Sequence, residues 1–312
     1  MGKSVYIYEL ISNISRIQLF NYETNNNMII AISGAGGFIG KQLTSFFESE
    51  NFEVRRIPRL DAETPPAELA KLLAGSDVII NLAGSPIIGR WNEAYKKMLF
   101  NSRIITTQKI VEALSLPDTK PKLLISASAV GIYSPLGEQT ESHFQIADDY
   151  LGQICSAWEL EAKKAEPFTR VVIIRLGIVL GKGGGALQRM LPIFKLGLGG
   201  KIASGKQGFS WIHISDLVKA VQFIIKNEKA KGEFNFTAPD VVDNEQFTKV
   251  MAKALKKPAF FAVPAFALKI LLGEGAIAVI GGQFAPPRHL LDEGFRFKFP
   301  DLEGALKEIV AD

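Results

Sequence analysis

The chain has 312 residues, of which 47% are hydrophobic and 22% are charged, so it is long enough to bury one large core or two unequal ones. Its 36 basic and 32 acidic residues are spread along the chain, and the net charge of +4 does not favour a nucleic-acid partner. A single cysteine, three scattered histidines and no apolar run of about 18 residues predict a cytoplasmic protein without a disulfide, a metal site or a membrane span.

Residues 1–27 precede the first convincing strand. Apolar residues from Ile7 to Ile17 recur at helical spacing, which allows a short amphipathic helix. Three asparagines stand directly before Met28, and they favour an appended segment instead. We therefore expect residues 1–27 to be an N-terminal extension outside the fold.

From Met28 onward, strand-like and helix-like segments alternate. The expected strands are 28–33, 52–57, 77–82, 122–126, 170–180 and 233–237, and the expected helices are 38–50, 67–73, 93–114 and 148–165. Alternation with short connections predicts the α/β class, a doubly wound parallel sheet of the Rossmann kind. The residues between Arg59 and Ala67 are too few for a further strand and crossover, so that unit is missing or very short.

The composition of the sequence changes after Leu180. Residues 181–208 are rich in Gly and Lys, and the chain from 244 onward reads as helices and loops. We expect a Rossmann domain over 28–180 and 212–237. A smaller, mainly helical C-terminal substrate lobe is expected over 181–211 and 238–312.

The stretch SGAGGFIGKQ lies between the first expected strand and helix. A Walker phosphate loop is excluded, because Ala35 stands where its first glycine belongs and Gln42 replaces its metal-binding hydroxyl. In a dinucleotide loop, Gly34 permits the tight turn, Gly37 lets the backbone approach a diphosphate, and Gly40 lets the helix pack closely. A tight turn without a ligand is the simpler alternative, but the position in a first βα unit favours a dinucleotide.

Free N–H groups of Phe38, Ile39 and Gly40 at the start of this helix provide an anion site. The choice of dinucleotide depends on the residues that end and directly follow the second strand, which read VRRIPR over 54–59 and close with Arg59. Its first acid, Asp61, comes only after the turn. Because a guanidinium pairs with phosphate, whereas a carboxylate would repel it, the sequence predicts NADP(H) with Arg59 at the 2′-phosphate. A surface arginine without this role is the alternative.

These stretches resemble the extended short-chain dehydrogenase/reductase superfamily of NAD(P)-dependent epimerases and dehydratases. SGAGGFIG resembles its glycine signature, INLAG its strand-four motif and ISASAVGIY its serine strand, and Asn101 falls at its helix asparagine. RLGIVLG and WIHISDL resemble two further landmarks. RWNEAYKKMLFNSR and GGGALQRMLPIFKLGLGG resemble, more narrowly, an atypical subgroup known as epimerase family proteins of the 39U type, and the similarity covers residues 28–312.

The resemblance implies an NADP-binding Rossmann domain, a C-terminal domain of the subgroup's own kind over 264–312, and no firmly assigned substrate. The residues expected to contact the cofactor are Gly34, Gly37, Phe38, Ile39, Gly40, Arg59, Leu82, Ala83, Gly84, Ser85, Arg90, Asn101 and Glu159.

The superfamily's reaction uses a Ser together with a Tyr that is followed four residues later by a Lys on one helix. With Tyr150 as the tyrosine, the lysine position falls on Ile154. With Glu159 as the acid that usually follows the lysine, the two positions fall on Leu151 and Cys155. Neither register contains a lysine, so we expect the Tyr–Lys pair to be absent.

Ser128 remains available to hydrogen-bond a substrate oxygen, and Tyr150 to donate a proton as a neutral phenol. We take both as candidate catalytic residues, with structural roles as the alternative. Phe194, Phe209 and Trp211 are expected to line a pocket over the nicotinamide.

Two functions fit these features. The first is an NADP(H)-dependent oxidoreductase or epimerase-like enzyme that transfers hydride to or from a small carbonyl or hydroxyl compound, which needs only a bound nicotinamide and an aligned substrate. The second is an NADP(H)-binding sensor or partner-binding protein with little turnover, because the Tyr–Lys pair is missing.

Overall fold

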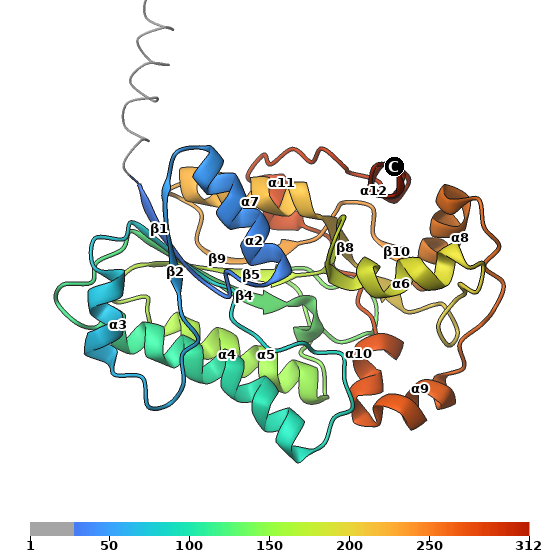
Figure 1. Ribbon diagram of the computed structural model, residues 1–312, viewed down its shortest axis with the longest axis horizontal. Coiled ribbons are helices and arrows are strands. Elements are labelled where there is room, and N and C mark those ends of the chain that lie inside the picture. The colour runs from blue at the N-terminus through green and yellow to red at the C-terminus, as the bar shows by residue number, and fades with distance from the viewer. Residues whose placement is uncertain (1–27, 312) are drawn as a thin grey trace, which may run out of the picture.

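The computed structural model describes residues 28–311 (Figure 1). The N-terminal extension expected over 1–27 lies outside these described residues. A central sheet is covered by helices above and below, and a second group of helices and short strands lies to the right in this view.

The central sheet is six-stranded and parallel throughout, in the order β2-β1-β3-β4-β5-β9. Its strands are β1 (Ile29–Ser33), β2 (Glu53–Ile57), β3 (Val78–Asn81), β4 (Leu123–Ala129), β5 (Arg170–Leu176) and β9 (Gly232–Phe236). The doubly wound prediction is confirmed. The chain passes from β2 through one short helix straight to β3, so β2 is an edge strand and the topological switch point, where such folds bind ligands, lies between β1 and β3.

Helices cover both faces of the sheet (Figure 1). One face carries α2 (Phe38–Ser49) and α7 (Ile214–Lys226), and the other carries α3 (Pro66–Leu73), α4 (Glu93–Leu114) and α5 (Tyr150–Lys163). Because side chains alternate along a strand, Ile30 and Ile32 join the α2 and α7 cluster while Ala31 joins the α3 and α4 cluster. Both sheet faces are therefore buried, which explains the continuous apolar runs in the sequence.

The strand expected over 170–180 is broken at Gly177 into β5 and β6 (Ile178–Leu180). β5 stays between β4 and β9, whereas β6 leaves the sheet and pairs with β8 (Trp211–His213). The Gly177 amide bonds to β9 and the next amide bonds to the Ser210 carbonyl, so the partner changes within one residue. A Cβ at Gly177 would lie 2.7 Å from that carbonyl oxygen, so the close approach requires glycine.

A third buried cluster lies beside the sheet. It is built from α6 (Gly185–Lys195), β7 (Gly208–Phe209), β10 (Val242–Asp243), α8 (Asn244–Leu255) and α12 (Leu302–Val310). Phe194, Phe209 and Trp211 are buried inside it, so the expectation that they line a nicotinamide pocket is wrong. Helix α6 was not expected, because glycines at its start and Pro192 within it obscure the helical pattern.

The remaining C-terminal elements are helical, as predicted. They are α9 (Ala265–Leu272), the 3₁₀ turn η2 (Glu274–Ala276), α10 (Ile277–Ile280) and α11 (Arg288–Asp292), and a further 3₁₀ turn, η1 (Val130–Ile132), follows β4. This segment returns to the Rossmann part of the molecule. The Trp91 amide donates to the Leu272 carbonyl at 3.3 Å, and Lys96 forms an ion pair with Glu274 at 2.5 Å.

Candidate functional site

The glycine turn between β1 and α2 has the geometry that its sequence predicts. Gly34 has a φ of +71°, and a Cβ there would lie 2.8 Å from the Leu82 carbonyl oxygen. A Cβ on Gly40 would collide with the Gly34 carbonyl oxygen and lie 2.7 Å from Ala35 Cα. The two glycines therefore allow a left-handed turn and close packing of α2 on that turn.

The start of α2 differs from the starts of α4 and α5. Asn92 caps α4 by accepting from the Tyr95 amide at 2.8 Å, and Asp149 caps α5 by accepting from the Gly152 amide at 2.9 Å. At Gly37, the residue before α2, no side chain among the described residues forms such a cap. The first N–H groups of α2, which belong to the turn beginning at Phe38, are thus left for an external acceptor.

A cavity of about 800 Å³ lies beside this turn. Its walls come from the turn after β1, the end of β2, the loop after β3 and one face of α4. The lining residues are Gly34, Ala35, Gly36, Arg56, Ile57, Pro58, Arg59, Leu60, Asp61, Ala62, Glu63, Ala83, Gly84, Ser85, Pro86, Met98, Asn101, Ser102, Ile105 and Thr106. The cavity therefore extends from the switch point to the edge strand β2.

Six of the predicted cofactor residues line this cavity, and they are Gly34, Arg59, Ala83, Gly84, Ser85 and Asn101. Gly37, Phe38, Ile39 and Gly40 form the adjoining start of α2, and Leu82 packs its carbonyl against Gly34. Arg90 is not part of the lining. It is exposed beside Gly273, where the loop after β3 meets the C-terminal segment.

The α4 wall contains residues that sequence reasoning missed. Met98 and Ile105 lie three and four residues from Asn101 on the same helix face, and Ser102 lines the cavity beside them. The signal was present, since residues three and four apart on a helix share a face. Asn101 therefore predicts its neighbours once its helix is known.

The three arginines near the end of β2 have different surroundings. Arg55 donates to the Ala74 carbonyl at 2.6 Å and pairs with Glu53, so it is structural. Arg56 lines the cavity but pairs with Glu48 at 2.8 Å. Arg59 is exposed on the cavity wall, and the described carboxylates form no ion pair with it. Of the three, Arg59 is the one free to receive an anionic ligand.

A buried polar network occupies the ends of β4 and β5. The Ser128 hydroxyl donates to Glu159 Oε1 at 2.7 Å, and Arg175 donates to both oxygens of Glu159 at 2.8 Å. Arg175 also donates to the Tyr133 hydroxyl at 2.8 Å, which in turn donates to Asn235 Oδ1 at 2.6 Å. Burial raises the pKa of Tyr133 to about 12, although Arg175 acts in the opposite sense. These groups satisfy one another in the interior.

This network changes the interpretation of two predicted residues. Glu159 is 5% exposed and lies outside the cavity, and its carboxylate neutralises Arg175, which argues against the predicted cofactor contact. Ser128 is 1% exposed, and its single proton is already donated. It therefore has only acceptor capacity left for a substrate.

Tyr150 is half-buried at the first residue of α5. Its hydroxyl donates to the Lys96 carbonyl at 2.8 Å, and its ring packs edge-on against Trp91. Burial raises the pKa of Tyr150, while Lys96 and Arg103 act in the opposite sense. Tyr150 is consequently a neutral phenol near neutral pH, able to give a proton but not to take one.

The lysine positions of the superfamily pattern are apolar and buried here. Ile154 is 2% exposed and Cys155 is 4% exposed, and burial raises the pKa of the Cys155 thiol to about 12. Lys163, further along α5, pairs with Glu233, and Lys164 pairs with Glu161. On α5, no lysine lies four residues after Tyr150 or Leu151, and the raised pKa of the buried Cys155 thiol disfavours its reactive thiolate form.

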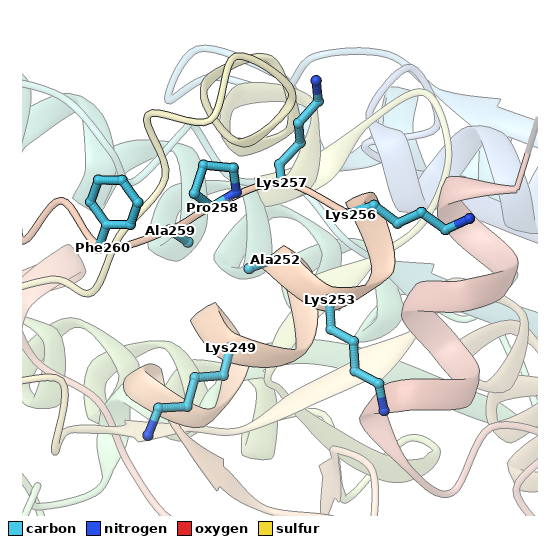
Figure 2. Close-up of a pocket in the computed structure, with 8 residues that line it drawn as sticks. All are labelled: Lys249, Ala252, Lys253, Lys256, Lys257, Pro258, Ala259 and Phe260. Carbon is cyan, nitrogen blue, oxygen red and sulfur yellow. The ribbon is translucent and has the colours of Figure 1, made fainter.

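A second, open hollow of about 440 Å³ lies at the end of α8 and shares no lining residue with the cavity. Figure 2 shows its lysines pointing outward in different directions, Lys249 and Lys253 from α8 and Lys256 and Lys257 from the residues that follow it, with Phe260 at one side. Among the helices of residues 28–311, none is long and apolar enough to cross a membrane.

The switch-point cavity and the glycine turn define a Rossmann protein with a dinucleotide-type loop. The model of the NAD dependent epimerase/dehydratase family matches residues 30–236, and that of a domain of unknown function, DUF1731, matches residues 263–309. The chain belongs to the NAD dependent epimerase/dehydratase family.

Its relatives include a protein named epimerase family protein SDR39U1 homolog, chloroplastic, from Arabidopsis thaliana, 37% identical over 94% of this chain and 89% of that protein. Epimerase family protein YfhF of Bacillus subtilis is 36% identical over 91% of this chain and 99% of that protein. A crystal structure of human epimerase family protein SDR39U1 (isoform 2) with NADPH superposes with a TM-score of 0.83. It is 35% identical and covers 90% of this chain and 99% of that one.

Proposed function

We propose that this chain binds NADP(H) in the switch-point cavity and acts as an oxidoreductase or epimerase-like enzyme of the extended short-chain dehydrogenase type, on a small carbonyl or hydroxyl compound. The observation that carries the cofactor assignment is the uncapped glycine turn at one end of a cavity that has Arg59 at the other. The human relative solved with NADPH supports the same cofactor.

In this proposal each part of the cavity has a role. The first amides of α2, from Phe38 onward, bind the diphosphate, since they are unpaired donors at the positive end of a helix. Arg59 pairs with the 2′-phosphate on the adenosine ribose. Met98, Asn101 and Ile105 of α4 flank the adenosine. When bound, the nicotinamide supplies or accepts the hydride.

The division of the chain is part of this proposal. The Rossmann domain over 28–180 and 212–237 holds the cofactor, and the lobe over 181–211 and 238–312 covers the substrate. The single cysteine fits the reducing cytoplasm that the composition favours.

The proton chemistry of the site favours donation over abstraction. Tyr150 retains its proton and α5 offers no lysine beside it, so the site suits reduction of a carbonyl, in which a neutral phenol protonates the developing oxyanion. Such a phenol must first leave the Lys96 carbonyl that now accepts its hydrogen bond.

One observation favours a second candidate function, an NADP(H)-binding sensor with little turnover. Ser128, the candidate substrate donor, gives its proton to the buried Glu159 instead. A site whose serine is engaged in this way retains the binding surface but loses one substrate contact.

One experiment distinguishes the enzyme from the sensor. Purified protein is titrated with NADPH by calorimetry, and NADPH oxidation is then followed with a broad panel of aldehydes, ketones and nucleotide sugars. Binding together with substrate-dependent oxidation supports the enzyme, whereas binding without oxidation across the panel supports the sensor. Protein that binds neither NADPH nor NADH contradicts both.

A further inference from the structure

Arg103 of α4 is a partly buried cation that lies against Trp158 of α5 and the loop after β3. Its Nη2 donates to the Ser85 carbonyl at 2.9 Å, and its Nη1 donates to the Leu99 carbonyl at 3.1 Å. The guanidinium lies over the Trp158 ring, with its Cζ 5.4 Å from the ring centroid. The side chain therefore spans from α4 to α5 underneath the cofactor-facing loop.

The loop is shaped around this side chain. A Cβ on Gly84 would lie 3.2 Å from the Arg103 guanidinium, so the glycine leaves room for it. The Ser85 amide donates to Ser102 Oγ at 2.9 Å while the Ser85 carbonyl accepts from Arg103. Two consecutive α4 residues thus bond to both the backbone amide and the backbone carbonyl of Ser85.

No carboxylate of the part of the chain that the structure describes forms an ion pair with Arg103. Among the described residues, the ionisable groups that act on it are Cys155, Tyr150 and Tyr95, with no carboxylate among them, and burial lowers the pKa of Arg103. Within residues 28–311, the acceptors of its hydrogen bonds are the Leu99 and Ser85 carbonyl oxygens. A desolvated cation without a partner is unfavourable, so the arrangement suits a bound anion or polar ligand nearby.

Arg103 also contacts α5 one turn from the positions that lack the family's lysine, because its guanidinium lies over Trp158, and Ile154 and Cys155 precede Trp158 by four and three residues. Its charge acts on Cys155, the lysine position in one register, and on Tyr150, the tyrosine of the other. A cation supplied from α4 therefore reaches the region in which the sequence of α5 provides none.

We propose that Arg103 replaces, from α4, the lysine that α5 lacks: it fixes the Ser85 backbone and places a positive charge on the nicotinamide half of the bound cofactor. This inference rests on the proposed function, because it requires NADP(H) in the cavity. Its role is one of positioning and charge, separate from the adenosine end that Arg59 holds.

The test compares two ligands by calorimetry: NADPH, and adenosine 2′,5′-bisphosphate, which fills only the adenosine end. Arg103→Gln keeps a donor for Ser85 but removes the charge, Arg103→Lys keeps the charge, and Arg296→Gln removes an exposed arginine elsewhere as a control. We expect Arg103→Gln to weaken NADPH about ten- to hundredfold and the bisphosphate less than about threefold. Arg103→Lys restores most of the NADPH affinity, and the control changes neither.

Several results would overturn the inference. These are unchanged NADPH affinity in Arg103→Gln, an equal loss for both ligands, or a Lys variant as weak as the Gln variant. Melting temperatures show which variants are folded. If Arg103→Gln does not fold, the Arg103→Lys protein provides the test. Loss of its affinity for NADPH but not for the bisphosphate contradicts the inference, whereas retention of both affinities supports it. Wild-type protein that binds neither ligand overturns the proposed function itself, and this inference with it.

Discussion

The Ser128 hydroxyl at the end of β4 donates a hydrogen bond to the Glu159 carboxylate of α5 at 2.7 Å. The same carboxylate accepts two hydrogen bonds from the Arg175 guanidinium of β5. A residue expected at the substrate and a residue expected at the cofactor thus bond to each other in the interior. Because removing one member of a buried ion pair leaves the other charge uncompensated, the three side chains act as one unit.

Removing one charge from this unit is expected to destabilise the fold. Glu159→Leu leaves the Arg175 guanidinium buried without its partner, so the free energy of unfolding falls by about 3–5 kcal/mol in urea titrations. The matched control is the double variant Glu159→Leu with Arg175→Met, which removes both charges and recovers much of that loss. Unchanged stability in Glu159→Leu combined with lost NADPH affinity would return Glu159 to the cofactor site.

Arg59 is expected to set the choice between the two nicotinamide cofactors. In Arg59→Asp a carboxylate faces the 2′-phosphate, so the affinity for NADPH falls about ten- to hundredfold while that for NADH changes less than about threefold. Both affinities are measured by calorimetry. Arg56→Asp is the comparison, because Arg56 already pairs with Glu48. If Arg56→Asp alone reversed the selectivity, the phosphate contact would belong to Arg56.

The close packing of α2 on the glycine turn gives a stability prediction. In Gly40→Ala the new methyl group collides with the Gly34 carbonyl oxygen, so α2 must shift, at a loss of about 1–3 kcal/mol in unfolding free energy and with weaker NADPH binding. Gly36→Ala is the matched control for stability, since a Cβ there has nothing within 4 Å, and it stays within about 0.5 kcal/mol of wild type. Equal stability of the two variants would contradict the packing role.

His213 gives a pH prediction. Its Nδ1 accepts from the Ser215 amide at 3.2 Å and caps α7, so the neutral ring carries its proton on Nε2, facing Glu308 at 3.2 Å. Burial lowers the pKa of His213 below 6.5, although the bond to Glu308 acts in the opposite sense. As the pH falls below about 6.5, His213 takes up a proton in the unfolded chain before it does so in the folded protein. The free energy of unfolding therefore decreases as the pH falls.

The measurement is the urea unfolding free energy at about pH 7.5 and about pH 5.5. Wild type is expected to lose stability at the lower pH, and His213→Gln to lose less of it. His143→Gln, which changes an exposed histidine, keeps the wild-type dependence. A His213→Gln protein with the full wild-type dependence would assign the effect to another group.

Local pattern was sufficient for much of the fold. The helix expected over 93–114 matches the bounds of α4, and the strands of the central sheet lie where apolar runs alternate with helical periodicity. The roles of Gly34 and Gly40 also followed from their spacing, because a tight strand-to-helix turn imposes the same steric limits wherever it occurs. These features depend on neighbours close in sequence.

The tertiary structure decided what the site residues are free to do. Ser128 and Glu159 are 31 residues apart, and Glu159 and Arg175 are 16 apart, and they meet only because β4 and β5 pair with Ser128 opposite Arg175. The change of partner at Gly177 and the reach of Arg103 toward α5 likewise depend on which segments lie side by side. Spacing along a chain determines which residues share a face of a helix or strand. Strand register and helix packing depend on segments far apart in the sequence, and they determine which polar groups are already hydrogen-bonded and which remain available to a ligand.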